Sequence, residues 1–290
     1  MKVLIAALML AVAVPSVAQV APASSAPART ILFVGNSFTQ GAHSAVKRFG
    51  AATVTDLNGD GFGGVPALFK RFAEQAGLDY AVSLETQGGQ MLGFHLAERR
   101  ARIDRAWDIV ILQDHSVLDR KQPGDATSHI RDAGLLAALF TRTNPNVRVE
   151  LMATWSRADQ VYKPGGPWTG TPLPKMAFDL RAASDRADAA SKDIDGVIPV
   201  GEAWNRAFVA GVADPNPYDG ISFGQVDLWA YDHYHGSIHG YYLEALVVFG
   251  KITGQDPRSL GSKETAAADL GISGAQAVQL QRVAAEQLGR

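Results

Sequence analysis

The stretch IVIL at residues 109–112 is a continuous run of aliphatic residues, and polar residues follow at once at 113–115. A short apolar run without alternation is typical of a strand in a parallel sheet, because such a strand is buried on both faces. A second run, TILFV at residues 30–34, ends at Gly35. Both runs predict buried strands.

Strand and helix patterns alternate along the rest of the chain. The predicted strands cover residues 30–34, 80–86, 109–112, 147–153 and 197–200, and the predicted helices cover residues 65–76, 92–106, 129–143, 176–191, 202–210, 237–253 and 273–288. This alternation favours right-handed βαβ crossovers, and hence an α/β fold with a central parallel sheet of about five strands between helices. No internal repeat or linker divides residues 30–290, which we interpret as one domain.

Composition excludes several classes of protein. The 290 residues are 47% hydrophobic and 19% charged, a globular composition, and the formal net charge of −2 favours no nucleic-acid partner. The chain has no cysteine, so disulfides, thiolate metal sites and cysteine nucleophiles are excluded. The sequence carries no signal for an oligomeric state.

The first residues have the pattern of an export signal. The apolar run 3–14 follows a lysine and precedes the small residues Ser16 and Ala18, and it is too short to span a membrane. Residues 1–18 are therefore predicted to be a signal peptide, and the Ala-, Pro- and Ser-rich residues 19–29 a leader. No later run reaches spanning length, so we expect an exported protein, periplasmic or secreted, without a membrane span after cleavage.

Residues with catalytic chemistry lie at the two ends of the chain. Ser37 follows the first predicted strand and Gly35, where a tight turn exposes its hydroxyl group. Asp232 and His235 lie three residues apart before a predicted helix. A serine nucleophile requires an imidazole base, and the imidazole requires a carboxylate that orients it. These three residues are the predicted catalytic triad.

These blocks of sequence resemble the SGNH (GDSL-type) hydrolase superfamily. Gly35-Asn36-Ser37 is similar to the first block, with Asn36 in place of the commoner aspartate, and Asp232-x-x-His235 is similar to the last. Gly88-Gly89 resembles the second block. The third block departs from the family pattern Gly-x-Asn-Asp, because Gln113 stands where the asparagine is expected.

The resemblance implies a flavodoxin-like three-layer α/β/α sandwich and a serine esterase that needs no cofactor. It implies that the backbone N–H groups of Ser37 and Gly89 and the side-chain amide of Gln113 form the oxyanion hole. The predicted export, the loop aromatics and the substrates usual in the family favour, as substrate, a carbohydrate that carries a small acyl group, above all acetyl. The further candidates for lining the substrate site are Asn36, His95, His115, Trp155, Tyr234 and His239.

Aromatic residues in predicted loops have two interpretations: they stack on sugar rings or they seal loop cores. These residues are Trp155, Tyr162, Trp168, Trp229, Tyr231 and Tyr234.

Other interpretations of the same residues remain open. Asp232, His235 and His239 would suit zinc, although a zinc site leaves the Ser37 turn unexplained. Asp56, Asn58 and Asp60 resemble the start of a calcium-binding loop, but the twelfth position of that loop is Ala67 rather than glutamate.

The alternative functions are a broad-range short-chain esterase or lipase, and a non-catalytic carbohydrate-binding protein on a hydrolase scaffold. The departures at Asn36 and Gln113 motivate the second of these.

Overall fold

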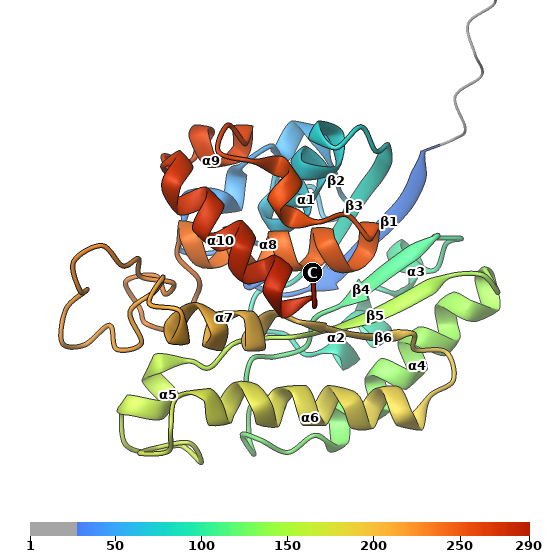
Figure 1. Cartoon of the computed structure of the whole chain (residues 1–290). Coiled ribbons are helices and arrows are strands. Elements are labelled where there is room, and N and C mark those ends of the chain that lie inside the picture. Colours follow the sequence, from blue (N-terminus) through green and yellow to red (C-terminus); the bar gives the residue numbers. More distant parts are fainter. Residues whose placement is uncertain (1–27) are drawn as a thin grey trace, which may run out of the picture.

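The computed structural model describes residues 28–290, so the predicted signal peptide and most of the predicted leader lie outside the described residues. Six parallel strands form one sheet in the order β2-β3-β1-β4-β5-β6 (Figure 1). The strands are β1 (Arg29–Gly35), β2 (Thr55–Asp56), β3 (Tyr80–Thr86), β4 (Ile109–Leu112), β5 (Arg148–Ala153) and β6 (Gly196–Pro199). The predicted parallel α/β sheet is confirmed, with six strands rather than about five. The two-residue edge strand β2 is too short to carry a sequence pattern.

Helices cover both faces of the sheet, which gives three layers (Figure 1). Helices α1, α8 and α10 pack on one face, and α2, α4 and α6 on the other. The bounds are α1 (Gly64–Gln75), α2 (Leu92–Glu98), α3 (Arg100–Ile103), α4 (Thr127–Thr143), α5 (Ala158–Tyr162), α6 (Pro174–Ala190), α7 (Val200–Val209), α8 (Ile238–Thr253), α9 (Thr265–Asp269) and α10 (Gly274–Gln287). Short 3-10 helices lie at Ala45–Arg48, Ala51–Thr53 and Pro257–Leu260. The single helix predicted at 92–106 is two helices that meet at Arg99.

The central strands are buried on both faces, as their sequences predicted. Along β1, Ile31 and Phe33 point into the hydrophobic cluster under α1 and α8, while Leu32 and Val34 point into the cluster under α4. The four residues of β4 alternate in the same way, and all are at most 1% exposed. Apolar residues at every position therefore supply both layers of the core.

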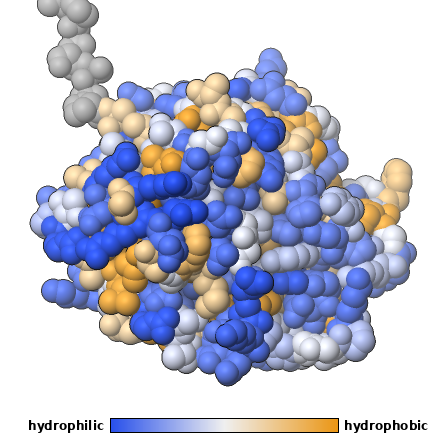
Figure 2. Space-filling view, turned by 180° about the vertical axis from the view of Figure 1, so that it is seen from behind, coloured by the Kyte–Doolittle hydropathy of each residue, from blue (hydrophilic) through white to orange (hydrophobic). Residues whose placement is uncertain are grey.

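On the face shown in Figure 2, hydrophilic residues predominate and apolar residues form scattered patches. Within residues 28–290, no helix combines the length and the apolar character that a membrane crossing requires.

The register of the sheet determines where a site can form. Gly35 at the end of β1 pairs with Thr86 at the end of β3, and Val34 pairs with Leu112 at the end of β4. The loops that follow these three strands therefore leave the sheet side by side. In an open parallel sheet, ligands bind at this carboxyl edge.

Candidate active site

The turn after β1 presents Ser37 at the carboxyl edge of the sheet. Gly35 is required at the start of this turn, because a Cβ atom there would lie 2.3 Å from Thr39 Oγ1 and 2.7 Å from Gln113 Oε1. The Asn36 side chain accepts a hydrogen bond from the backbone N–H of Phe38, which stabilises the turn from within. The absence of a side chain at Gly35 therefore lets this turn pack closely against Thr39 and Gln113.

A second turn, before α8, holds Asp232 and His235 together. Asp232 Oδ1 accepts hydrogen bonds from the backbone N–H groups of Tyr234 at 3.1 Å and His235 at 3.0 Å. Asp232 Oδ2 lies 2.6 Å from His235 Nδ1. Helix α8 begins directly after this turn, where Ser237 Oγ caps it by accepting from Gly240 N–H. The carboxylate is thus fixed by the backbone of the same turn that carries the imidazole.

The two turns meet. His235 Nε2 lies 2.9 Å from Ser37 Oγ, although the two residues are 198 positions apart in the sequence. The structure therefore brings the three residues of the predicted triad into one continuous chain of hydrogen bonds. The carboxylate of Asp232 faces Nδ1 of His235, and the hydroxyl group of Ser37 faces Nε2 of the same ring. Proton transfer from serine to histidine requires this order.

The surroundings of the triad favour an ionised Asp232 and a neutral His235. Burial alone raises the pKa of Asp232, but hydrogen bonds from the His235 side chain and from two backbone N–H groups outweigh it and lower the pKa below its usual value. Burial lowers the pKa of His235, and the charges of His43 and Arg157 lower it further against the opposing effect of Asp232. A neutral imidazole is the form that can accept a proton.

Backbone N–H groups lie beside Ser37 on the loop after β3. Gln87 N–H donates to the Gly35 carbonyl group, and Asn36 Nδ2 donates to the Gln90 carbonyl group, so this loop lies against the serine turn. Gly89 adopts a left-handed conformation with φ +71°. No protein group within residues 28–290 accepts from the backbone N–H of Ser37 or Gly89. Both N–H groups are therefore available as oxyanion donors, and this role stays a prediction.

The fold is shared with solved structures of low sequence identity. A DUF4886 family protein from Bacteroides uniformis aligns with a TM-score of 0.61 and 18% identity, over 90% of this chain and 94% of that chain. A candidate GDSL-like lipase from Parabacteroides merdae aligns with a TM-score of 0.51 and 16% identity, over 78% and 95%. A two-domain esterase (CEX) active on acetylated mannans aligns with a TM-score of 0.50 and 16% identity, over 78% of this chain and 49% of that chain.

No protein-family model matches the sequence, and the comparison with curated proteins finds no match. The structural alignments nevertheless cover most of the chain. The chain has the SGNH hydrolase fold. The fold expected from the four sequence blocks is thereby confirmed.

Gln113 departs from the SGNH pattern, and the structure places it differently from the prediction. Its side chain is buried beneath the serine turn, where Oε1 accepts hydrogen bonds from Asn36 N–H at 3.0 Å and Thr39 Oγ1 at 3.0 Å. Its amide nitrogen donates to the carbonyl group of Asp114. Both ends of the amide are engaged within the protein, so this arrangement does not support the predicted role as an oxyanion donor. Gln113 instead buttresses the turn that carries Ser37.

Replacing Gln113 with methionine separates these two roles. Methionine has a similar length but cannot accept from Asn36 N–H, which is buried, so we expect a loss of about 1–3 kcal/mol in unfolding free energy. Loss of an oxyanion donor would instead lower kcat by ~10²–10³ without changing stability. Chemical denaturation and steady-state kinetics of the same variant measure both quantities. A stable variant with a 100-fold lower kcat would contradict the buttressing role.

Four of the predicted lining residues do not line the site. His95 is 0% exposed and bonds to Glu85 Oε2 through Nδ1. Trp155 is also 0% exposed and is stacked between Phe38 and Trp204 at ring distances of 4.1 and 4.4 Å. These two side chains belong to the core.

Asn36 and His239 are the other two predicted lining residues that do not line the site. The Asn36 side chain is buried and holds neighbouring backbone groups together. His239 is half-buried and faces Gln276 of α10 instead of the triad. Because α8 begins at Ile238, the residue after it turns toward α10.

Tyr234 lies beside the triad, whereas His115 is a buried residue with no contact to it among those of residues 28–290. The Tyr234 ring lies 4.1 Å from the His235 ring, and its hydroxyl group is 3.3 Å from Ser116 Oγ. His115 is nearly buried, and burial together with the charge of Arg157 lowers its pKa to about 4. His115 is therefore uncharged at neutral pH. Tyr234 remains a candidate for contact with substrate.

The alternative zinc ligands do not come together as a group of three. Among residues 28–290, the only group of three potential metal ligands that lie together is His43, Asp232 and His235, and His239 is not part of it. The Asp56 carboxylate accepts from backbone N–H groups of its own turn, and Asn58 bonds to Glu85, Thr86 and Arg102. The side chains of Asp56 and Asn58 are thus engaged by other groups of the protein.

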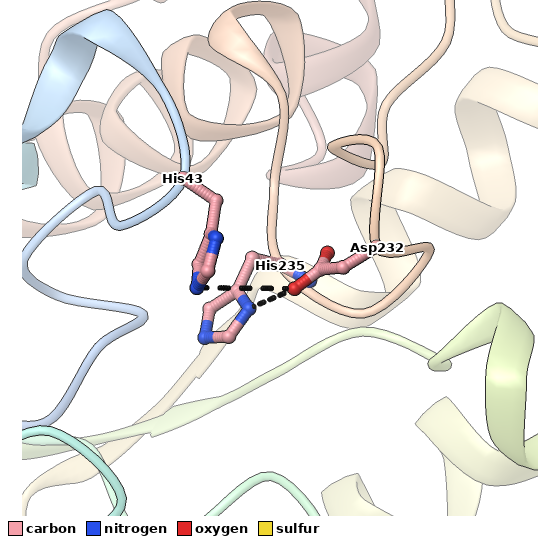
Figure 3. Close-up of side chains that lie close together, drawn as sticks. All are labelled: His43, Asp232 and His235. Carbon is pink, nitrogen blue, oxygen red and sulfur yellow. Dashed lines mark hydrogen bonds and ion pairs between the residues drawn. The ribbon is translucent and has the colours of Figure 1, made fainter.

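No sequence pattern pointed to His43, and Tyr231 was only one of several aromatic residues in predicted loops that could stack on a sugar ring. His43 lies six residues after Ser37, and the successive turns of residues 36–42 carry it back over the triad (Figure 3). Tyr231 precedes Asp232 and is 78% exposed. The one sequence signal was their position next to the predicted nucleophile and carboxylate.

Proposed function

We propose that this protein is a serine esterase that hydrolyses small acyl esters by way of an acyl-serine intermediate. The observation that carries the proposal is the chain of hydrogen bonds from Asp232 through His235 to Ser37, with distances of 2.6 and 2.9 Å. The SGNH fold, with neighbours that include an esterase active on acetylated mannans, supports the same activity.

In the acylation step, Ser37 Oγ attacks the ester carbonyl carbon while His235 Nε2 takes the hydroxyl proton. Asp232 stabilises the resulting imidazolium, which the lowered pKa of the carboxyl group favours because it keeps that group ionised. The N–H groups of Ser37 and Gly89 receive the developing oxyanion. The tetrahedral intermediate then collapses, and the alcohol leaves with the proton from His235.

In the deacylation step, water replaces the alcohol. His235 accepts a proton from the water molecule, whose oxygen attacks the acyl carbon, and the second tetrahedral intermediate expels Ser37 Oγ. The proton returns to the serine, and the carboxylic acid leaves. Both steps use the same imidazole, so a single histidine suffices.

A hollow next to the predicted oxyanion loop supports a polar alcohol as the carrier, because charged side chains form part of its lining. The hollow has a volume of about 790 Å³, and Gln90, Phe94, Asp119, Arg120, Lys121 and Arg131 are among the residues that line it. Arg120 Nη1 donates to the Gly89 carbonyl group at 3.3 Å, so the hollow adjoins the predicted oxyanion loop. Charged walls suit the hydroxyl groups of a sugar better than a long alkyl chain.

The carrier that we favour is therefore an acetylated carbohydrate. Of the loop aromatics chosen as sugar-stacking candidates, Trp155, Trp168 and Trp229 are buried and belong to the core. Tyr231 and Tyr162 are exposed, and Tyr231 lies directly beside the triad. Its ring is the aromatic surface that this proposal assigns to substrate. The export signal predicted at residues 1–18 agrees with a substrate outside the cytoplasm.

A serine-directed fluorophosphonate probe tests the esterase directly. We expect one covalent label, at Ser37, identified by peptide mass spectrometry, and acetate release from a panel of acetylated polysaccharides. The folded Ser37→Ala protein is the matched control and should take up no label. Absence of labelling in the folded wild-type protein would reject the esterase and favour the carbohydrate-binding alternative.

A further inference from the structure

His43 contacts both of the residues that activate Ser37, and it comes from a different part of the chain (Figure 3). Its ring lies 4.3 Å from the His235 ring at an interplanar angle of 32°. Its Nε2 atom lies 3.9 Å from Asp232 Oδ2, the oxygen that also bonds to His235. The mechanism described above does not use this side chain.

Tyr231 fixes the orientation of His43. The Tyr231 hydroxyl group lies 2.7 Å from His43 Nδ1, and the two rings meet edge to face. An ionised Asp232 can only accept hydrogen bonds, so the favourable tautomer of His43 carries its hydrogen on Nε2. Nδ1 is then the acceptor, and the Tyr231 hydroxyl group is its donor.

The backbone also holds His43 in place. His43 has a φ of +64°, a conformation that few residues other than glycine adopt. The Tyr241 hydroxyl group of α8 donates to the carbonyl group of the preceding residue, Ala42, at 3.0 Å. Uncommon backbone conformations of this kind occur preferentially at functional sites.

We propose that His43 is a positioning residue of the triad. The ring of His43 covers one face of His235, and the Nε2–H group of His43 points toward Asp232. The inference rests on the proposed esterase function. The rings of His43 and Tyr234 lie 4.3 and 4.1 Å from the His235 ring, so both restrict the movement of its imidazole. Because the Nε2–H group of His43 faces the same carboxylate oxygen, His43 also weakens the attraction by which Asp232 keeps a proton on His235.

A pH dependence follows from the groups that face His235. These are Asp232 from its own turn, His43 from the turn after β1, and Arg157 from the loop after β5. Burial and the positive charge of Arg157 lower the pKa of His235, while Asp232 raises it. Removing the His43 ring admits water and leaves His235 as the only imidazole beside Asp232. Both changes raise the pKa of His235.

The test uses the Ser37→Ala protein, in which the pKa of His235 is measured by NMR titration of the imidazole carbons. We expect His43→Asn to raise this pKa by roughly half a unit or more. Asparagine tolerates positive φ, so the substitution removes the ring without imposing backbone strain. Tyr231→Phe removes only one hydroxyl group and should shift the pKa in the same direction by a smaller amount.

His233→Asn is the matched control. His233 also has a positive φ, +56°, but its ring faces Tyr218 at 4.2 Å instead of the triad. We expect this variant to leave the pKa of His235 unchanged. Equal titration of His235 with and without the His43 ring would overturn the proposal.

The same substitution in the active protein gives the second readout. The acidic limb of the kcat/KM profile on p-nitrophenyl acetate should move to higher pH by the shift that NMR measures, because protonated His235 cannot act as a base. If His235 titrates as expected but no variant with Ser37 intact hydrolyses esters, the esterase proposal fails and the positioning of His235 stands. A limb that does not move in an active His43→Asn enzyme would overturn the positioning role.

Discussion

Replacing Ser37 with alanine is expected to lower kcat/KM for ester hydrolysis by at least ~10⁴-fold, because the variant cannot form an acyl-enzyme. The Ser37 hydroxyl group makes a single side-chain hydrogen bond, to His235, so the fold should be unaffected. The measurement is acetate release, together with the thermal unfolding midpoint of the same preparation.

Ser262→Ala is the matched control for this experiment. Ser262 is exposed and lies near the carboxyl end of the chain, after the last 3-10 helix. Its substitution should leave both the rate and the unfolding midpoint unchanged. A Ser37→Ala protein that retains more than one tenth of the wild-type rate would exclude Ser37 as the nucleophile.

Replacing Asp232 with asparagine is expected to lower kcat by ~10³–10⁴-fold with little change in KM. The reason lies in the two oxygens of this carboxylate. Oδ1 accepts from the backbone N–H groups of Tyr234 and His235, and Oδ2 faces His235 Nδ1. In the variant, the amide oxygen keeps the two backbone bonds, so the NH₂ group must face Nδ1.

An NH₂ group facing Nδ1 selects the wrong tautomer of His235. The imidazole then carries its hydrogen on Nε2 and cannot accept the proton of Ser37. Asp219→Asn, in an exposed position on the preceding loop, is the matched control. The imidazole nitrogen shifts in NMR spectra report the tautomer independently of the rate. A variant with the wild-type tautomer and a 1,000-fold lower kcat would contradict this explanation.

The geometry also bears on the two departures from the family pattern. Asn36 and Gln113 raised the alternative of a non-catalytic binder, since both replace residues expected at the site. Both side chains are buried, and both bond to backbone groups of the loops around Ser37. They hold the turn in place, and neither substitution interrupts the contact between His235 and Ser37. The departures therefore give less support to the binder than the sequence indicated.

Much of this protein could be predicted from local patterns in the sequence. The apolar runs at 30–34 and 109–112 identified strands buried on both faces, because the hydrophobic pattern of a strand depends only on the layers around it. The Asp232-x-x-His235 spacing placed carboxylate and imidazole on one turn, since residues three apart on a turn are neighbours. Positions directly after strands also pointed to Ser37 and Gly89.

The tertiary structure alone decided which way each side chain faces. Trp155 follows a predicted strand as a site residue would, yet it is buried between Phe38 and Trp204, which come from distant parts of the chain. Apart from its position near Ser37, His43 had no sequence signal, and it reaches the triad only because the turn after β1 meets the turn before α8. Local periodicity reports the burial of a segment, whereas the orientation of one side chain depends on contacts between segments that only the packed chain brings together.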